Sequence, residues 1–397
     1  MTLLGGLLAL AAMTGGLPED CLLGTPGFPV TARSLAMGRA EFMDPSPMGA
    51  LANPSAAVSA GVGLSLCASA GMDLEMEKRT RTVYDSFGSS IGEAEHSFDR
   101  SADLFPGGVA ASLAGFDGMP RGLGLAAGWR ARNGFGYDWD REVRSEYYAL
   151  LGSEALSISG TAGELCASAS FSPLDALSLG LGAGWLSCTR EETWRQIWVD
   201  ESIPDVLETQ ESDLEVVTVR AAFTARPSRR VTASAGVEAP LSAGWSGDAD
   251  GPLDLPPLAR AGFLWIPGNS LRSVFTAEFS YRAMSGARFD GADMGLRDSW
   301  SASAGVENSL PGGGPECRFG FRYDRSPIAR CLDCVSVTAG LGFDLSGWTL
   351  DAGGLFSPRT WEQVDVGSLP SFSEGDSLSV EETETVLLLS LSRRISL

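Results

Sequence analysis

Few residues in this 397-residue chain are suited to catalysis. The one histidine, His96, lies in the polar stretch Glu93-Ala94-Glu95-His96-Ser97. A histidine-dependent hydrolase needs such an imidazole beside a serine nucleophile and a third group that orients it. We find no HExxH or phosphate-loop motif. The sequence therefore predicts a protein that is not an enzyme and needs no cofactor, with His96 as a solvated loop residue.

The seven cysteines include one closely spaced pair, Cys331-x-x-Cys334. A convincing zinc signature would need a second pair or a nearby histidine, so no metal site is predicted. A local disulfide in an outer loop is the other interpretation. Cys67 and Cys317 fit lipid-facing positions of their predicted strands, where cysteine packs as a small hydrophobe.

Two acidic runs, at residues 199–215 and 374–384, could bind divalent cations. Carboxylates are frequent in both, and the first contains no basic residue. Because Ca²⁺ takes several carboxylate oxygens, such runs in outer loops could bridge to anionic lipid headgroups. The spacing matches no EF-hand loop. The alternative is a solvated, mutually repulsive loop surface.

The segments that must position these residues show a pattern in which residue type alternates at every second position. Over residues 177–187, Leu, Ala and Trp alternate with Ser and Gly. Such alternation places one face of a strand against an apolar medium and the other against something small, polar or wet. It recurs over residues 61–397, so we expect an all-β fold, a transmembrane antiparallel β-barrel of about 14 strands. The outward side chains are expected to include Leu179, Leu181, Phe279, Val337 and Leu389.

Composition and the N-terminal region agree with an outer-membrane location. The net charge of −21 excludes a nucleic-acid partner. Residues 1–18 contain a ten-residue apolar run followed by small residues, which predicts a signal peptide. Residues 22–60 do not alternate and predict a compact plug. The expected partner along the barrel is outer-membrane lipid.

The connections alternate between short turns and long polar loops, as they do between the two sides of an outer-membrane barrel. The short turns are expected at 117–120, 172–175, 227–229, 267–269, 311–314 and 346–347. The long loops are expected at 84–105, 138–153, 197–213, 246–256, 288–296, 324–333 and 358–380. Tryptophans beside both kinds of connection predict two interfacial belts. The belt near the long loops would contain Trp139, Trp194, Trp198, Trp245, Trp300 and Trp361.

Charged side chains at the inward parity predict a salt-bridged lumen. A charge facing the bilayer midplane costs about 2–4 kcal/mol for arginine, so these groups should point inward. Unpaired desolvated charges are also costly, so they should pair with one another or with the plug. The expected lumen charges are Arg130, Arg132, Arg220, Glu238, Glu278, Arg318, Arg322, Asp344 and Asp351, with Asp73, Glu75 and Glu307 at the same parity.

The N-terminal region resembles a known family. ARSLAMGRA at residues 32–40 and MGALANPSA at 48–56 are similar to the start of FadL-type outer-membrane transporters and their PorV-like relatives. There a comparable stretch precedes an Asn-Pro-Ala plug motif and the first strand. The resemblance implies a 14-stranded barrel, and a plug motif formed by Arg33, Met37, Gly38, Asn53 and Pro54. Arg39 and Ser55 depart from the usual residues.

The resemblance implies a channel for uptake of hydrophobic small molecules. Aromatic side chains in the long loops could contact such a ligand at the outer mouth. These are Phe87, Phe98, Tyr147, Tyr148 and Trp198; Tyr137 and Trp139 fit the aromatic belt better. The alternative is a PorV-like anchor or shuttle for other proteins, or a structural barrel. Transport predicts an apolar pocket with a lateral gap or strand kink, whereas an anchor predicts a filled lumen.

Overall fold

The fold is described from a computed structural model of the chain. It describes residues 25–26, 30–59, 63–85, 87, 89–115, 122–144, 149–248, 250–268, 272–310, 314–364 and 377–396. The signal peptide expected over residues 1–18 lies outside these ranges. No helix within them is both long and apolar enough to cross a membrane.

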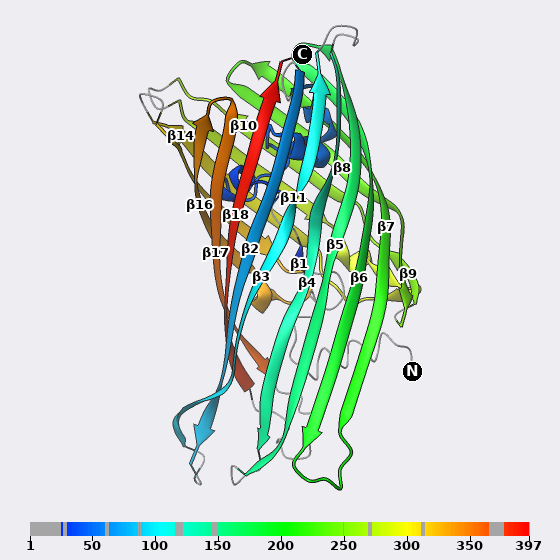
Figure 1. The fold of residues 1–397 in the computed structure, drawn as a ribbon, viewed down its shortest axis with the longest axis vertical. Helices are drawn as coiled ribbons and strands as arrows, with labels where there is room; N and C mark the ends of the chain where they lie inside the picture. The colour runs from blue at the N-terminus through cyan, green and yellow to red at the C-terminus, as the bar shows by residue number, and fades with distance from the viewer. Residues whose placement is uncertain are drawn as a thin grey trace.

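Fourteen antiparallel strands form a closed barrel (Figure 1). They are β2 (Gly63–Tyr84), β3 (Ser90–Ala114), β4 (Leu123–Arg144), β5 (Leu150–Leu174), β6 (Leu177–Trp198), β7 (Val206–Ser228), β8 (Val231–Gly247), β10 (Leu258–Trp265), β11 (Val274–Arg282), β14 (Ser299–Ser309), β15 (Glu316–Arg325), β16 (Cys334–Leu345), β17 (Trp348–Val364) and β18 (Ser377–Ile395). Each pairs with the next in this order, and β18 pairs back onto β2. The predicted fold class is therefore confirmed.

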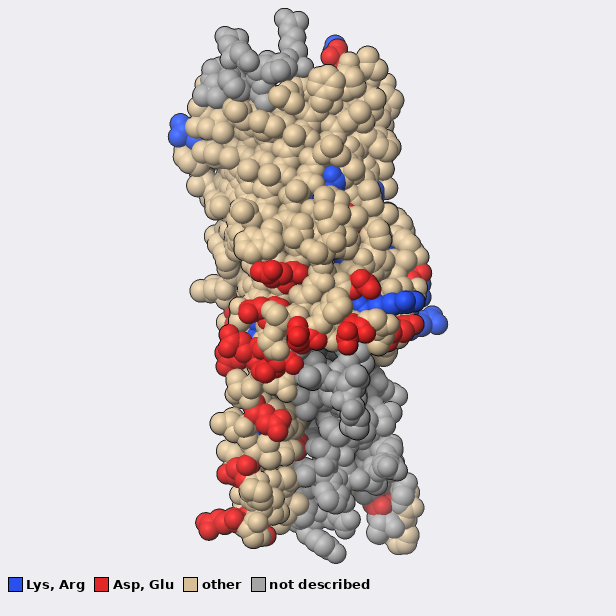
Figure 2. All heavy atoms as spheres, turned by 90° about the vertical axis from the view of Figure 1, so that its right-hand side faces the viewer, with Lys and Arg blue, Asp and Glu red and all other residues tan. Residues whose placement is uncertain are grey.

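The outward face of the wall is apolar. Leu179, Leu181, Phe279, Val337 and Leu389 all point outward, with 46–69% of their surface exposed. Figure 2 shows that the half of the molecule nearer the C-terminal end is almost free of charged side chains on the face in view. Acidic side chains gather below that band. Alternation arises because one face of each strand meets this apolar band while the other meets the lumen.

The strands are longer than the sequence predicted. Much of the loop expected at residues 84–105 belongs to β2 and β3, and residues 206–213 begin β7. Beyond the apolar band both faces of a strand meet polar surroundings, so apolar–polar alternation fades while the hydrogen-bonded ladder continues. β2 to β7 reach 22–25 residues, whereas β10 and β11 have 8 and 9. The barrel is therefore much taller on one side.

Residues 30–59, here called the inner segment, lie within the ring of strands near the short-turn end (Figure 1). The segment contains α3 (Ala32–Ala36), α4 (Pro47–Ala52) and the 3-10 helix η1 (Pro54–Ser59). Thr31 caps α3 by accepting from the Ser34 backbone N–H, and Ser46 caps α4 in the same way through Gly49. α3 contacts β15 to β18, while α4 and η1 contact β2 to β7.

Two connections at the long-loop end form a second structure inside the barrel mouth, here called the cap. It comprises β9 (Gly251–Asp254), the 3-10 helix η2 (Met284–Gly286), β12 (Arg288–Phe289) and β13 (Ala292–Asp293). β12 pairs with both β9 and β13. A further 3-10 helix, η3 (Arg330–Leu332), follows β15, and a short strand, β1 (Thr25–Pro26), pairs with β4.

The aromatic belt predicted near the long loops is wrong for three tryptophans. Trp194, Trp245 and Trp361 are each 6–7% exposed and belong to buried apolar clusters. Trp194 and Trp245 join a cluster with cap residues such as Met284 and Phe289. These rings point inward because the cap gives them an apolar surface that the sequence pattern did not reveal. Cys67 also faces inward, against α4, rather than lipid.

Candidate functional site

A cavity of about 310 Å³ lies between the cap and the inner segment. Its apolar side is formed by Ala162, Leu186 and Val216 from the wall, and by Leu253 and Met284 from the cap. All five are buried. The volume is at the lower end of the range for small-molecule sites, and such sites combine an apolar lining with a few polar groups. The lumen between the cap and the inner segment is therefore not completely filled by side chains.

A buried charge network, here called the wall network, lies directly beside these wall residues, with Glu164 opposite Leu186 in the β5–β6 ladder. Glu164 accepts from Arg130 at 2.8 Å and from Arg220. Glu238 accepts from Arg220 at 2.8 Å and from Arg132. Arg130 and Glu164 are each about 1% exposed, so each charge is stabilised by its partners rather than by water.

Two further arginines border this network. Arg282 lies 3.7 Å from Glu238, and its Nε has no hydrogen-bond partner among the described residues. Arg260 lines the cavity beside it. Eight arginines and six carboxylates line the whole cavity, so its polar side carries an excess of positive charge. The chain as a whole is strongly acidic.

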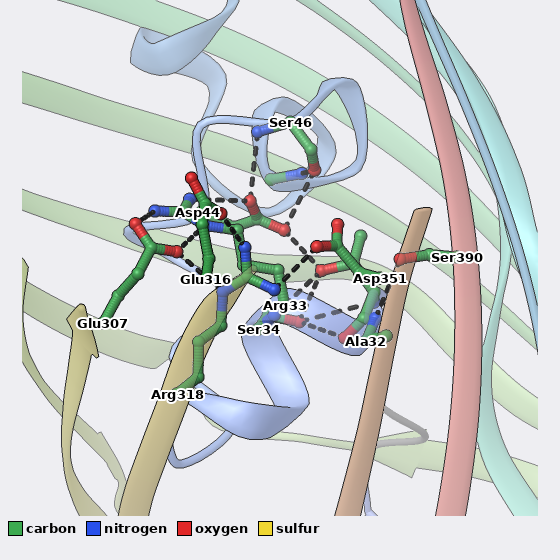
Figure 3. A network of polar contacts seen from close by, with 12 residues as sticks. Ala32, Arg33, Ser34, Asp44, Ser46, Glu307, Glu316, Arg318, Asp351 and Ser390 are labelled. Atoms are coloured by element: carbon green, nitrogen blue, oxygen red, sulfur yellow. Dashed lines mark hydrogen bonds and ion pairs between the residues drawn. The ribbon is translucent and has the colours of Figure 1, made fainter. Parts of the chain in front are cut away.

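A second network anchors the inner segment to the wall (Figure 3). Arg33 of α3 donates to Glu307 at 2.8 and 3.1 Å and lies 3.7 Å from Asp44. Arg318 donates to the same Glu307 at 2.7 Å and to Asp351 at 2.6 Å. Burial alone would lower the pKa of Arg33, but Glu307 and Asp44 outweigh it and raise that pKa above its usual value. We call this set the anchor network.

Small residues of the wall allow the inner segment to approach closely. A Cβ on Gly320 would lie 2.2 Å from the Gly38 backbone nitrogen, and one on Gly180 would lie 2.2 Å from that of Ser55. Gly38 itself has φ +76°, a conformation that favours glycine, and its N–H donates to Thr338 at 3.0 Å. Inward glycines of the wall such as Gly180 and Gly320 therefore form the surface against which the backbone of the inner segment packs, here called the glycine seat.

The cap is held to the wall by polar contacts at its chain ends. Tyr281 donates to Asp298 at 2.6 Å, and Ser285 donates to the same carboxylate through its hydroxyl at 2.6 Å. These donors lower the pKa of Asp298 because they stabilise its charged form. The neighbouring Arg297 donates to the Ser326 carbonyl at 2.6 Å.

The wall is divided between β3 and β4. Among the described residues, their ladder runs only from Ala114 to Gly108 on β3 and from Gly124 to Arg130 on β4. Both strands continue beyond it. On β3, Pro106 lacks an N–H for the ladder, and the register between β2 and β3 shifts beside it. On β4, the register between β4 and β5 shifts beside Ala131. Two irregularities at the same level bend the strands apart. We call the division the slot.

Most predicted lumen charges do face inward. Arg130, Arg132, Arg220 and Glu238 meet in the wall network, and Arg318 and Asp351 in the anchor network. Glu278 accepts from the Phe42 N–H at 2.9 Å, and Arg322 pairs with Asp324 at 2.6 Å. Asp344 shares the parity but lies exposed at the β16–β17 turn, outside both networks. Sequence reasoning missed Glu164, although its alternation with Leu165 on β5 could have revealed it.

The predicted plug residues lie in the inner segment. Arg33 belongs to the anchor network, and Met37 and Gly38 contact the glycine seat. Asn53 donates to the Phe42 carbonyl at 3.0 Å and accepts from Ser55, which holds the turn before η1. Pro54 lies against Gly180 and Gly182.

Of the aromatic residues proposed for the outer mouth, Phe87 and Trp198 do not line the cavity. Phe87 is 90% exposed, and Trp198 lies at the end of β6, where its backbone N–H donates to Asp205. Tyr147 and Tyr148, and the side chain of Phe98, lie outside what the structure describes. The aromatic residues near the cavity come instead from the cap and the inward face of the wall.

The cation and disulfide interpretations receive no support. Residues 206–215 form part of β7, so successive side chains alternate between its faces instead of converging in a loop. No group of three or more potential metal ligands is found among the described residues. Cys331 and Cys334 are both free thiols.

The comparisons with known proteins concern the fold. No family model and no curated protein matches the sequence. A Pseudomonas aeruginosa FadL homologue superposes with a TM-score of 0.64 at 14% identity, covering 94% of this chain and 99% of the other. The toluene transporters TodX of Pseudomonas putida and TbuX of Ralstonia pickettii give 0.59 and 0.56, both at 13% identity and covering 93% of this chain and 99% of theirs. The chain has the FadL-type fold, so this part of the predicted resemblance is confirmed.

Proposed function

We propose that the chain is an outer-membrane channel for uptake of hydrophobic small molecules. The observation that carries the proposal is the cavity, which has an apolar side and lies within a closed barrel. The similar folds of a FadL homologue and of two toluene transporters support it. A PorV-like anchor would need no such cavity, and the filled lumen expected for that role does not match the described residues.

The slot provides a path from the cavity into the bilayer. Ala131 and Arg132, which line the cavity, lie on β4 directly after its last pairing with β3. A hydrophobic molecule leaving sideways would enter lipid without crossing the glycine seat of the inner segment. The inner segment would then act as a plug that prevents leakage of water and ions toward the short-turn side.

The positive excess on the polar side of the cavity favours a ligand with one anionic end. A carboxylate could approach Arg282 and Arg260 while its apolar part contacts Leu186 and Val216. A labelled fatty acid and labelled toluene are therefore the two probes that test the substrate class.

Filling the cavity is expected to abolish uptake. Ala162 is fully buried at the cavity, so Ala162→Trp would place an indole in the space that the ligand needs. The overpacking costs about 1–3 kcal/mol, which a folded barrel can tolerate. The matched control is Ala169→Trp on the same strand, where the side chain faces outward. Uptake of both probes into proteoliposomes is the measurement.

The expected result is uptake at the level of empty liposomes for Ala162→Trp and normal uptake for Ala169→Trp. Both variants should keep the gel-mobility shift between heated and unheated samples that marks a folded barrel. Equal uptake by the two variants would exclude the cavity as the route. If the wild-type protein takes up neither probe, the proposed function is wrong.

A further inference from the structure

Basic side chains gather at the short-turn end of the barrel, although the chain carries a net charge of −21. Outside the anchor network, the described short connections and adjoining strand ends contain six arginines, which are Arg226, Arg229, Arg230, Arg272, Arg393 and Arg394. The carboxylates there are Asp175, Asp344 and Glu316, and Glu316 pairs with Arg318. Acidic side chains gather instead beyond the other border of the apolar band (Figure 2). Charge is therefore separated along the barrel axis.

Three of these arginines lie on two neighbouring connections. Arg229 and Arg230 form the turn between β7 and β8, and Arg272 lies between β10 and β11. The Ile266 N–H, just after β10, donates to the Arg230 carbonyl at 2.8 Å, and a Cβ on Gly268 would lie 2.8 Å from Arg230 Nη2. The Arg230 side chain therefore lies over the neighbouring connection. All three arginines are exposed, and none forms an ion pair with a carboxylate among the described residues.

The same arginines lie at the border of the apolar band. Trp265, the last residue of β10, stacks on Phe275 with 5.4 Å between the ring centroids, and both rings are exposed on the outward face. On another part of the wall, the Arg393 guanidinium lies over the Trp348 ring, 4.9 Å from its centroid. Exposed tryptophan is typical of the level of the lipid headgroups. The guanidinium groups therefore lie where the phosphates of a bilayer leaflet would be.

We propose that Arg229, Arg230, Arg272 and Arg393, here called the arginine collar, bind anionic phospholipids in the leaflet at the short turns. A guanidinium donates paired hydrogen bonds to phosphate oxygens, and it finds no carboxylate nearby that would compete. The acyl chains of the same lipid pack against the apolar wall, which a soluble phosphate cannot do. Bound lipids hold the short-turn end at one depth in the bilayer. The collar does not depend on the proposed channel function.

Native mass spectrometry of retained lipid tests the collar. The full-length protein is released from micelles that contain equal amounts of phosphatidylglycerol and phosphatidylcholine, and the wild type is expected to retain more phosphatidylglycerol. The collar variant carries Arg229→Gln, Arg230→Gln, Arg272→Gln and Arg393→Gln. Its preference for phosphatidylglycerol should fall by about fivefold or more, because each basic side chain near an anionic headgroup contributes attraction of that order.

The matched control makes the same change at four exposed arginines nearer the long-loop end, so both variants have the same net charge. It carries Arg100→Gln, Arg195→Gln, Arg288→Gln and Arg330→Gln. This control should keep the wild-type preference. Both variants should also keep the gel-mobility shift of a folded barrel. If the collar variant does not fold, the turn pair Arg229→Gln with Arg230→Gln is compared with Arg195→Gln and Arg330→Gln in the same way.

Three results would overturn the collar. They are a wild type with no preference between the two lipids, an equal loss of preference in both variants, and no loss in the collar variant. Glycerol 3-phosphate distinguishes a lipid site from a site for soluble anions. Displacement of phosphatidylglycerol by an equal concentration of this headgroup analogue would also overturn the collar, whereas retention of the lipid supports it. Uptake of labelled fatty acid is measured separately, so failure of the channel function is recognised independently.

Discussion

The variant Glu164→Gln is expected to lose about 3–5 kcal/mol of folding stability, because it leaves buried arginines without their counter-charge. Glu164 is 1% exposed and accepts from Arg130 and Arg220, with Arg132 at 3.6 Å. A glutamine preserves the shape but supplies no negative charge and turns one acceptor into a donor. The measurement is urea unfolding in lipid vesicles, followed by tryptophan fluorescence.

The control for this variant is Glu215→Gln. Glu215 lies on the outward face of β7 and is exposed, so the same chemical change should alter stability by less than about 0.5 kcal/mol. A similar loss in both variants would mean that the effect is not due to buried pairing. A wild-type unfolding curve for Glu164→Gln would contradict the stabilising role of the wall network.

Gly320→Leu is expected to displace the inner segment from its seat and open the lumen to ions. The nearest atom to a Cβ at this position is the Gly38 backbone nitrogen at 2.2 Å, and backbone cannot move aside as a flexible side chain can. We expect single-channel conductance several times that of the wild type, together with leakage of small polar solutes from liposomes.

Gly354→Leu provides the matched control for this prediction. Gly354 faces outward on the neighbouring part of the wall, where a Cβ would lie 3.4 Å from a Leu387 side-chain carbon. It should conduct like the wild type. If Gly320→Leu folds and conducts no more than this control, the inner segment is not the plug that we propose.

Residue patterns predicted the wall well, because one physical cause acts on every strand. The apolar band and the lumen impose opposite demands on alternate side chains, so Leu179 and Arg220 could be assigned to faces without a structure. The same parity correctly brought Arg318 and Asp351 to one side of the wall. The parity failed at Asp344, where the strand ends and both faces meet solvent.

The cavity could not be predicted in the same way. Its cap side comes from Leu253 and Met284, in connections that have no period, and their burial depends on contacts across the barrel. Trp194 and Trp245 looked like belt residues because their environment is set by that cap. The slot could not be predicted from the sequence either. Pro106 indicates a single irregularity in β3, whereas the division also depends on a register shift beside Ala131 in β4.

Among the described residues, the unequal height of the barrel leaves the long-loop end of β7 with a paired strand on one side only. β7 pairs with β6 up to Val206, but its ladder with β8 ends at Ser212. Leu207 on this free border is 70% exposed, which would invite another copy to add a strand in a crowded membrane. Glu208 lies on the same border and is exposed, and like charges on two approaching copies repel. We therefore expect the acidic run that resembled a cation site to weaken pairing between neighbouring barrels along this border.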